Sequence, residues 1–432
     1  MKKIILCRTN VFARVFLPKQ SLVLWDISTQ QEIATPPNSR SSGSQRHQYT
    51  RCTVEKKIFL FILTCLLPFS FASRNPALAQ SEAETDSGAV VCAPDVYLSA
   101  PGDCLPLGPS VYITEMAKLG LTFPPRLLST QKPDPSLTRV PYLYFHLEED
   151  NVPILSGPAG AETGQSYLPG FVYVSYIDRV DTGRGIYYML QNGGWIPGKG
   201  ARVSEISSYQ GLEFDSTPHN AFGWSFEYIP VKQAPGYNTP EAGFYLNPFI
   251  DIFQVYATQN VDGADWNMIG SGQWVEARKV AIVNPNTTPP EGVTTGRWID
   301  VDLAEQTLAV YDNYELVFAT VIASGLEPFW TRPGLFQIYQ KKETENMRNN
   351  DPSDFYYLDN VPWTMYFDKA RALHGAYWRT RFGYPQSHGC VNLSVGDSHW
   401  LFKWAYEGDW VYIHDPSGLT PTDPALYKDW AY

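Results

Sequence analysis

The residues with the clearest chemical potential lie near the C-terminal end of the chain, where two histidines and a cysteine are close in sequence. His374 precedes Gly375, and His388, Gly389 and Cys390 are consecutive. The thiolate is the reactive form of a cysteine, and a nearby imidazole can take the proton from the thiol. The pattern therefore favours a cysteine nucleophile that works with a histidine base.

The neighbours of the cysteine fit this chemistry. Gly389 allows a tight turn beside the sulfur, and the backbone N–H groups of His388, Gly389 and Cys390 are candidate donors to an oxyanion. His374, on a separate strand or loop, is the better candidate for the base. In an extended segment His388 points the same way as Cys390, so its imidazole either approaches the sulfur or packs structurally.

Two other interpretations of these residues stay open at this point. A zinc site can be drawn from His374, His388 and Cys390 with His399 or His414, although no C-x-x-C or H-E-x-x-H spacing supports it. A buried cysteine with unrelated histidines is the other alternative. The spacing by itself excludes neither.

An export signal is expected near the N-terminus. Lys56 and Lys57 precede an apolar run at 58–72, which is followed by Ala77-Leu78-Ala79. Basic residues, a short apolar run and an Ala-x-Ala site are typical of a secretory signal peptide, and the run is shorter than the roughly 20 residues that cross a membrane. We expect a signal peptide at 56–79, with an uncleaved anchor as the alternative.

Residues 1–55 precede this signal and are a doubtful N-terminal extension. They contain no methionine after Met1 and no clear periodic pattern. We hypothesise that Met1 is a mis-assigned start and that translation begins near Val54, with a long leader as the alternative. Mass spectrometry of the intact precursor decides between them, because peptides from residues 2–50 would exclude the later start.

Three of the six cysteines, namely Cys92, Cys104 and Cys390, follow the expected cleavage site. Cys92 and Cys104 are close together in a segment rich in Pro and Gly, and an oxidising compartment favours a disulfide between them; two separate thiols are the alternative. Cys390 is then left without a partner. An unpaired thiol in an exported protein needs a chemical reason.

The composition indicates short strands and turns. Aromatic residues make up 14% of the chain and charged residues 18%, with 32 Gly and 34 Pro. A coiled coil would be richer in Ala, Glu, Lys and Leu, and the 44% of hydrophobic residues are enough for a core, which a disordered chain lacks. The net charge of −11 argues against binding to nucleic acid. We therefore predict an all-β protein.

An internal repeat follows a linker and a short N-terminal segment at 80–142. Its two copies run from about 152 to 203 and from about 231 to 283, and Trp195 of the first aligns with Trp274 of the second. Short strands with Gly or Asn turns predict small barrels.

These two barrels resemble bacterial SH3-like domains, and we place them at 143–208 and 220–284. Exposed aromatic side chains in them would bind wall polymer. The alternative is that Trp195 and Trp274 belong to the barrel cores.

Another β domain is expected at 293–415, after a Pro-rich linker and before a C-terminal tail at 416–432. Its first two strands alternate in hydrophobicity at 298–303 and 307–311, and Asp312-Asn313 makes the turn that follows. Only the segment 398–406 is clearly helical.

The motif Ser387-His388-Gly389-Cys390-Val391-Asn392, with His374-Gly375 upstream, resembles the signature of the L,D-transpeptidase catalytic domain of bacterial cell-wall enzymes, the YkuD-like family. Further similarities are spread over 293–415, at 298–311, 324–325, 331–334, 361–367 and 408–413. Two positions depart from the pattern. Arg332 separates Thr331 from Pro333, and Asn392 stands where many members carry Arg.

The resemblance implies a β-sandwich-like catalytic domain that acts on peptidoglycan stem peptides and needs no metal or cofactor. Cys390 would attack the carbonyl of the third residue of a tetrapeptide stem, release D-Ala and form a thioester, which an amine of a second stem resolves. His374 would act as base and then acid, oriented by the Gly375 carbonyl.

The same resemblance assigns supporting roles. Tyr366, Trp363 and Arg379 are expected to line the substrate pocket, and Ser387 and Asn392 to support the loop.

The implied function is cross-linking during cell-wall biogenesis, in the cell wall, the periplasm or the extracellular space. With water as acceptor the same site would be an L,D-carboxypeptidase. A cysteine peptidase and a non-catalytic wall-binding protein are the remaining alternatives. Membrane contact is expected only through an uncleaved signal.

Overall fold

The computed structural model describes residues 127–140 and 142–427. Within these ranges the chain consists mostly of strands, α3 (Val395–Trp404) is the one α-helix, and the all-β prediction is confirmed. The expected signal peptide, the N-terminal extension and the Cys92–Cys104 pair lie outside the described residues. In the described ranges no helix is long and apolar enough to cross a membrane.

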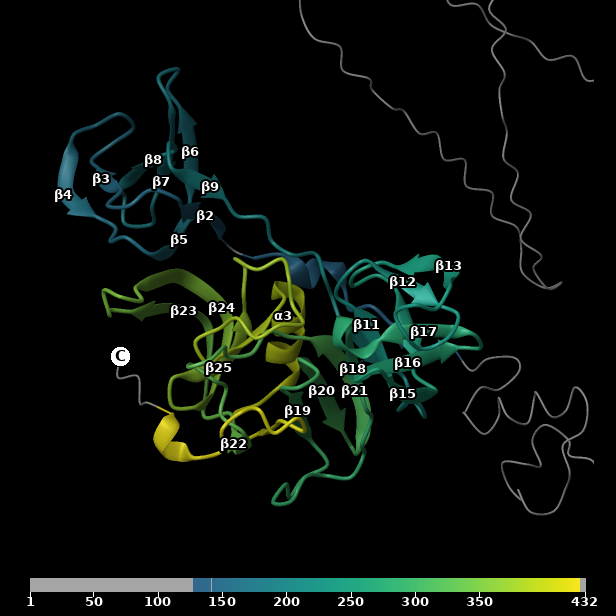
Figure 1. Cartoon of the computed structure of the whole chain (residues 1–432). Helices are drawn as coiled ribbons and strands as arrows, with labels where there is room; N and C mark the ends of the chain where they lie inside the picture. The colour runs from purple at the N-terminus through teal and green to yellow at the C-terminus, as the bar shows by residue number, and fades with distance from the viewer. Residues whose placement is uncertain (1–126, 141, 428–432) are drawn as a thin grey trace, which may run out of the picture. The chain divides into compact units, whose positions relative to one another are not determined.

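Two sheets build the C-terminal domain. The first has the order β1-β10-β21-β20-β19-β27-β22, and the second has the order β26-β25-β24-β5-β2-β9, with β23 paired to β24 as a long hairpin (Figure 1). The strands that belong to the C-terminal domain are β19 (Trp298–Asp302), β20 (Thr307–Asp312), β21 (Glu315–Val321), β22 (Gly334–Gln337), β23 (Gln340–Asn349), β24 (Tyr356–Asp368), β25 (Arg371–Gly375), β26 (Val391–Leu393) and β27 (Trp410–His414).

An apolar core joins the two sheets and α3. Ile299 of β19, Leu373 of β25 and Leu401 of α3 are among its fully buried members. Alternate residues of a strand point to opposite faces, so Trp298 packs in a different cluster from its neighbour Ile299. The same alternation on β25 directs His374 away from the face that carries Leu373.

Helix α3 begins earlier than its apolar pattern indicates. The sequence predicts a helix at 398–406, but the side chain of Ser394 accepts a hydrogen bond from the Asp397 N–H at 3.1 Å and caps a helix that starts at Val395. The helix ends at Trp404, because Ala405 is already extended. The capping residue therefore sets the start of the helix, and the apolar pattern does not.

Two modules with one strand order precede the C-terminal domain, and each contains a five-stranded and a three-stranded group. In the first module, these are β4-β3-β8-β7-β6 and β5-β2-β9; in the second, they are β13-β12-β17-β16-β15 and β14-β11-β18. Since the groups correspond strand for strand, the repeat seen in the sequence is a repeat of sheet topology.

The strands of the first module are β2 (Leu143–Leu147), β3 (Pro153–Leu155), β4 (Glu162–Ser166), β5 (Phe171–Tyr176), β6 (Asp178–Asp181), β7 (Ile186–Met189), β8 (Trp195–Pro197) and β9 (Ala201–Val203). Those of the second are β11 (Phe222–Ser225), β12 (Ile229–Lys232), β13 (Glu241–Leu246), β14 (Ile252–Gln254), β15 (Ala257–Val261), β16 (Ala264–Gly270), β17 (Gln273–Glu276) and β18 (Val280–Val283). Trp195 and Trp274 occupy the equivalent strands β8 and β17, and both are partly buried.

The two modules differ in how they meet the C-terminal domain. Strand β5 of the first module pairs in parallel with β24, so the second sheet runs from one domain into the other. Within the described ranges, no strand of the second module shares a sheet with the C-terminal domain. Two short strands outside the modules, β1 (Thr130–Gln131) and β10 (Leu212–Phe214), extend the first sheet beyond β21.

Asp397 fastens the segment before β10 to the start of α3. It is fully buried, and its carboxylate accepts hydrogen bonds from the Gly211 N–H at 2.8 Å and from the Thr320 hydroxyl at 2.5 Å. Burial raises the pKa of Asp397 to about 6, because a charge is costly away from water.

Replacing Asp397 by Ala should lower the free energy of unfolding by roughly 3 kcal/mol, because two buried donors lose their acceptor. Urea unfolding measures this loss. Asp397→Asn, which keeps an acceptor, should lose less.

The same pair of proteins tests the pKa. The Asp397 carboxyl ionises near pH 4 when unfolded and near pH 6 when folded, so the stability of the wild type relative to Asp397→Asn should fall as the pH rises through this window. Parallel pH profiles for the two proteins would contradict the assignment.

Candidate active site

Parallel pairing of β25 with β26 places the predicted nucleophile and base together. In this register Leu373 lies opposite Val391, and His374 lies opposite Asn392. Cys390 precedes β26 and is two positions before Asn392, so the strand alternation directs both side chains to the face that also carries His374. Cys390 and His374 line the same pocket, and the structure brings these predicted residues together.

The turn before β26 is held by hydrogen bonds around Gly389. The hydroxyl of Ser387 donates to the Cys390 carbonyl at 2.6 Å and accepts from the Gly389 N–H at 3.1 Å. Thr331 donates its hydroxyl to the Gly389 carbonyl at 2.9 Å. Gly389 has a φ of 110°, a conformation that a side chain disfavours, which explains the glycine at this position.

These bonds narrow the set of oxyanion donors. The Gly389 N–H is already used by the Ser387 hydroxyl. Of the three amides named from the sequence, those of His388 and Cys390 therefore remain as candidates.

His374 is held as a neutral imidazole. It is 2% exposed, and burial lowers its pKa to about 4. Its Nδ1 lies 3.4 Å from the Gly375 carbonyl, and its Nε2 lies 3.2 Å from the Asn392 amide nitrogen. Since that amide nitrogen can only donate, Nε2 is the acceptor and Nδ1 carries the hydrogen.

Arg379 fixes the orientation of the Asn392 amide. Its Nε donates to the Asn392 oxygen at 2.7 Å, which leaves the amide nitrogen facing His374. Its two terminal nitrogens donate to the side chain and the backbone carbonyl of Gln386, at 2.9 and 2.5 Å. Burial lowers the pKa of Arg379 to about 10. Arg379 lines the pocket of Cys390, and its guanidinium is engaged by Asn392 and Gln386.

Cys390 is a protonated thiol in this arrangement. Burial raises its pKa, a shift that the Ala372 N–H and the Arg371 charge partly oppose. Its Sγ lies 3.8 Å from the Ala370 carbonyl, and among the described residues no hydrogen bond joins Sγ to His374. Because Nε2 of His374 faces Asn392, removal of the thiol proton requires Nε2 to exchange that contact for the sulfur.

The pocket that contains Cys390 has a volume of about 310 Å³. Its lining combines polar side chains, among them the catalytic candidates, with apolar and aromatic ones. Its lining residues are Phe171, Met347, Tyr356, Leu358, His374, Trp378, Arg379, Gln386, Ser387, His388, Cys390 and Asn392. Sequence reasoning missed the apolar lining residues, because Phe171 and the residues of β23 and β24 carry no motif.

His388 lies at the rim of this pocket. Its Nε2 is 3.0 Å from the Asp354 carboxylate, in the connection between β23 and β24, and its ring packs near Phe329 and Tyr356. In the described part of the chain it makes no hydrogen bond to Cys390. Of the two arrangements that the sequence left open for His388, the structure has the packed one.

Two residues predicted to line the substrate pocket do not line the pocket of Cys390. Trp363 stacks on His399 of α3, with ring centroids 3.9 Å apart, and lines neither pocket near the sulfur. Tyr366 lines a neighbouring pocket of about 710 Å³. Trp363 has a φ of 56°, which interrupts the regular alternation of side chains along β24. This backbone irregularity cannot be recognised from the sequence alone.

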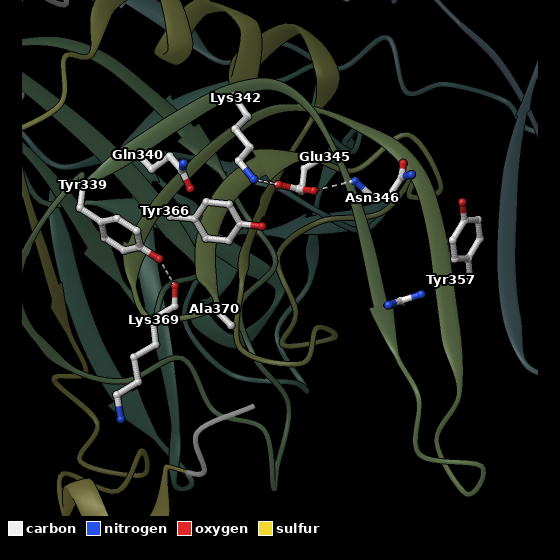
Figure 2. A pocket seen from close by; sticks show the side chains of 10 residues that line it. Tyr339, Gln340, Lys342, Glu345, Asn346, Tyr357, Tyr366, Lys369 and Ala370 are labelled. Carbon is white, nitrogen blue, oxygen red and sulfur yellow. Dashed lines mark hydrogen bonds and ion pairs between the residues drawn. The ribbon is translucent and has the colours of Figure 1, made fainter. Parts of the chain in front are cut away.

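Figure 2 shows this neighbouring pocket, which is rich in polar and charged side chains. Lys342 forms an ion pair with Glu345, and Tyr339 donates its hydroxyl to the Lys369 carbonyl. Ala370, whose carbonyl is next to the Cys390 sulfur, is also part of its lining. Ala370 therefore links the larger pocket to the surroundings of the sulfur, although Cys390 itself lines only the smaller pocket.

The histidines considered for zinc are not gathered around one point. His399 contacts the Leu137 carbonyl, and His414 contacts Asp300 at 2.7 Å. Among the described residues, no group of three or more His, Cys, Asp or Glu side chains is placed to hold a metal ion.

Residues 296–413 match the family model YkuD, described as the L,D-transpeptidase catalytic domain. This segment contains both strands of the candidate active site and the turn between His374 and Cys390. A search of curated proteins finds no match to the chain.

Several solved structures are similar to part of the chain. A crystal structure of an L,D-transpeptidase from Stackebrandtia nassauensis is 28% identical, over 28% of this chain and 57% of that one, with a TM-score of 0.24. The catalytic domain of an E. faecium L,D-transpeptidase is 25% identical, over 28% of this chain and 100% of that one, with a TM-score of 0.26.

A Mycobacterium tuberculosis L,D-transpeptidase 1 is 22% identical, over 27% of this chain and 60% of that one, with a TM-score of 0.24. The chain thus spans little more than half of the first of these structures. At TM-scores below 0.5 the structural likenesses carry no weight for the function, which depends on the family match and the geometry of the site.

The protonated state of Cys390 predicts slow alkylation at neutral pH. The rate with iodoacetamide should be low at pH 7 and should still be rising above pH 9, because burial raises the pKa of the thiol and only the thiolate reacts. Intact-protein mass spectrometry follows the reaction, with Cys390→Ala as the control for other sites. A rate that reaches its plateau below pH 8 would indicate a preformed thiolate–imidazolium pair and would contradict this description.

Proposed function

We propose that the protein is a peptidoglycan L,D-transpeptidase that forms cross-links between stem peptides during cell-wall biogenesis, on the premise that residues 296–413 match the L,D-transpeptidase catalytic domain. The observation that carries the proposal is the position of Cys390 and His374 on neighbouring parallel strands inside this domain, lining one pocket. A cysteine and a neutral histidine in one pocket are the components of an acyl-transfer site.

The first half of the reaction transfers an acyl group to the enzyme. The sulfur of Cys390 attacks the carbonyl carbon of the third residue of a donor tetrapeptide stem, while Nε2 of His374 takes the thiol proton. The tetrahedral intermediate then collapses: the bond to the terminal D-Ala breaks, and the departing amine receives the proton from His374. A thioester on Cys390 and free D-Ala are the products.

The second half transfers the acyl group to an acceptor. A side-chain amine of a second stem attacks the thioester carbonyl and gives a proton to His374. The carbon–sulfur bond breaks as the new amide bond forms, and the proton returns from His374 to the sulfur. Water in place of the amine would give L,D-carboxypeptidase activity.

The surrounding residues position the reacting groups. The Gly375 carbonyl accepts a hydrogen bond from Nδ1 of His374 and so fixes the tautomer of the imidazole. This hydrogen bond becomes stronger when the imidazole is protonated, because the donor then carries a positive charge. Arg379 and Asn392 hold the ring from the other side. The amides of His388 and Cys390 are the proposed donors to the oxyanion.

A two-substrate reaction fits the space around the sulfur. The smaller pocket is lined by Cys390 itself, and the larger one is lined by Ala370, whose carbonyl is 3.8 Å from the sulfur. We assign the donor stem to the smaller pocket and the approach of the acceptor to the larger, polar one.

The other parts of the chain complete the proposal. The signal-like segment at 56–79 supports export to the cell wall, the periplasm or the extracellular space, where Cys92 and Cys104 can form a disulfide. The first and second modules, which the sequence likens to SH3-like domains, are proposed to bind wall polymer. A cysteine peptidase and a purely wall-binding protein remain the competing functions.

Incubation with purified muropeptides tests the proposal. The wild-type protein should convert tetrapeptide monomers to dimers, whereas Cys390→Ala should make none and should retain its thermal unfolding temperature. Shortened monomers alone would show a peptidase or carboxypeptidase, and binding without any product would show an adhesion protein. Dimer formation by Cys390→Ala would exclude Cys390 as the nucleophile.

A further inference from the structure

The two modules have the same strand order, but within the described residues only the first shares a sheet with the catalytic domain. Phe171, Val172 and Tyr173 of β5 lie opposite Tyr356, Tyr357 and Leu358 of β24 in a parallel register. The Phe171 N–H also donates to the Phe355 carbonyl at 3.1 Å. The first module therefore meets β24 at the residues that line the pocket of Cys390.

A glycine permits this close approach. Gly170 has a φ of 144°, and a Cβ at this position would lie 2.3 Å from the Phe355 carbonyl oxygen. Any larger residue would push β5 away from β24 or force the backbone of one of them to move.

Partly buried polar contacts hold the junction together. Ser175, which is 1% exposed, donates its N–H and its hydroxyl to the Asp359 carboxylate at 3.1 and 2.5 Å. The Asn360 amide donates to the Ser175 hydroxyl at 2.9 Å, and the Tyr144 hydroxyl donates to the Asn360 carbonyl at 2.9 Å. Buried polar groups that satisfy one another in this way specify a single arrangement.

Aromatic rings continue from this junction to the catalytic histidine. The ring centroids of Phe171 and Tyr173 are 5.0 Å apart, and those of Tyr173 and Trp378 are 6.4 Å apart. Trp378 in turn lies 5.6 Å from the imidazole of His374. Phe171 is 43% exposed, so part of its ring is free to contact a ligand.

We propose that the first module forms one wall of the substrate pocket and that Phe171 is a specificity-determining residue for the donor. This inference rests on the proposed function. Phe171 lines the pocket of Cys390 together with the apolar side chains of Met347, Leu358 and Trp378. Such an apolar lining suits the aliphatic part of a stem peptide and leaves the reacting carbonyl to the polar groups around Cys390.

The Phe171→Ala variant of the full chain tests this assignment in the muropeptide assay. The KM for the tetrapeptide donor should rise roughly tenfold, the scale on which one apolar contact discriminates between substrates. The value of kcat and the rate of Cys390 alkylation by iodoacetamide should stay close to those of the wild type, because the nucleophile and the base are untouched. Phe171→Leu, which keeps an apolar side chain, should restore most of the loss.

Phe244→Ala is the matched control. Phe244 is a partly exposed phenylalanine on β13 of the second module, whose strands join no sheet of the catalytic domain in the described ranges. Its replacement should leave the donor KM unchanged. Equal KM values for Phe171→Ala and Phe244→Ala would overturn the inference.

Gly170→Ala provides a second route to the same conclusion. This substitution forces β5 away from β24, so it should raise the donor KM without removing any side chain from the pocket. An unchanged KM would contradict the claim that the first module forms a wall of the substrate pocket. A wild-type protein that gives no product at all would instead refute the proposed function, so the two failures are distinguishable.

Discussion

The parallel pairing of β25 with β26 is the interaction on which the active site depends. A single register sets His374 opposite Asn392 and brings Cys390 to the same face. A shift by one residue would turn the imidazole and the thiol to opposite sides of the sheet. The core residues Leu373 and Val391, directly opposite each other on the other face, hold this register because they would lose their burial in any shifted alignment.

Burial then determines the electrostatic state of the site. It lowers the pKa of His374 and raises that of Cys390, so both groups are neutral at rest. A neutral pair avoids the cost of burying two charges, and it protects the thiol from adventitious electrophiles. In the proposed reaction, charge develops only when the sulfur attacks a substrate carbonyl, and the Gly375 carbonyl and the amides of the turn are then in place to stabilise it.

The turn of the active site and the strand content could be predicted from the sequence, because they depend on local motifs and on composition. The Ser-His-Gly-Cys motif identified the turn, and Gly389 has the positive φ that such a turn requires. Strand content followed from composition. The start of α3 was missed because a capping serine, Ser394, outweighs the apolar pattern.

Other features depend on contacts between distant segments and have no local signal. The packing of Trp363 on His399 follows from an unusual backbone angle in β24. The pairing of His388 with Asp354 and the place of Phe171 in the pocket both require the tertiary fold. Asn392 was expected only to support the loop, whereas its amide contacts the catalytic imidazole directly.

The most direct test of the account is to trap the acyl-enzyme. Wild-type protein mixed with a tetrapeptide donor and quenched in acid should show, by intact-protein mass spectrometry, an increase equal to the donor less one alanine, and peptide mapping should place it on Cys390. An adduct on another residue, or an unchanged turnover of the donor by Cys390→Ala, would contradict the claim that the Cys390 thiol carries the acyl group.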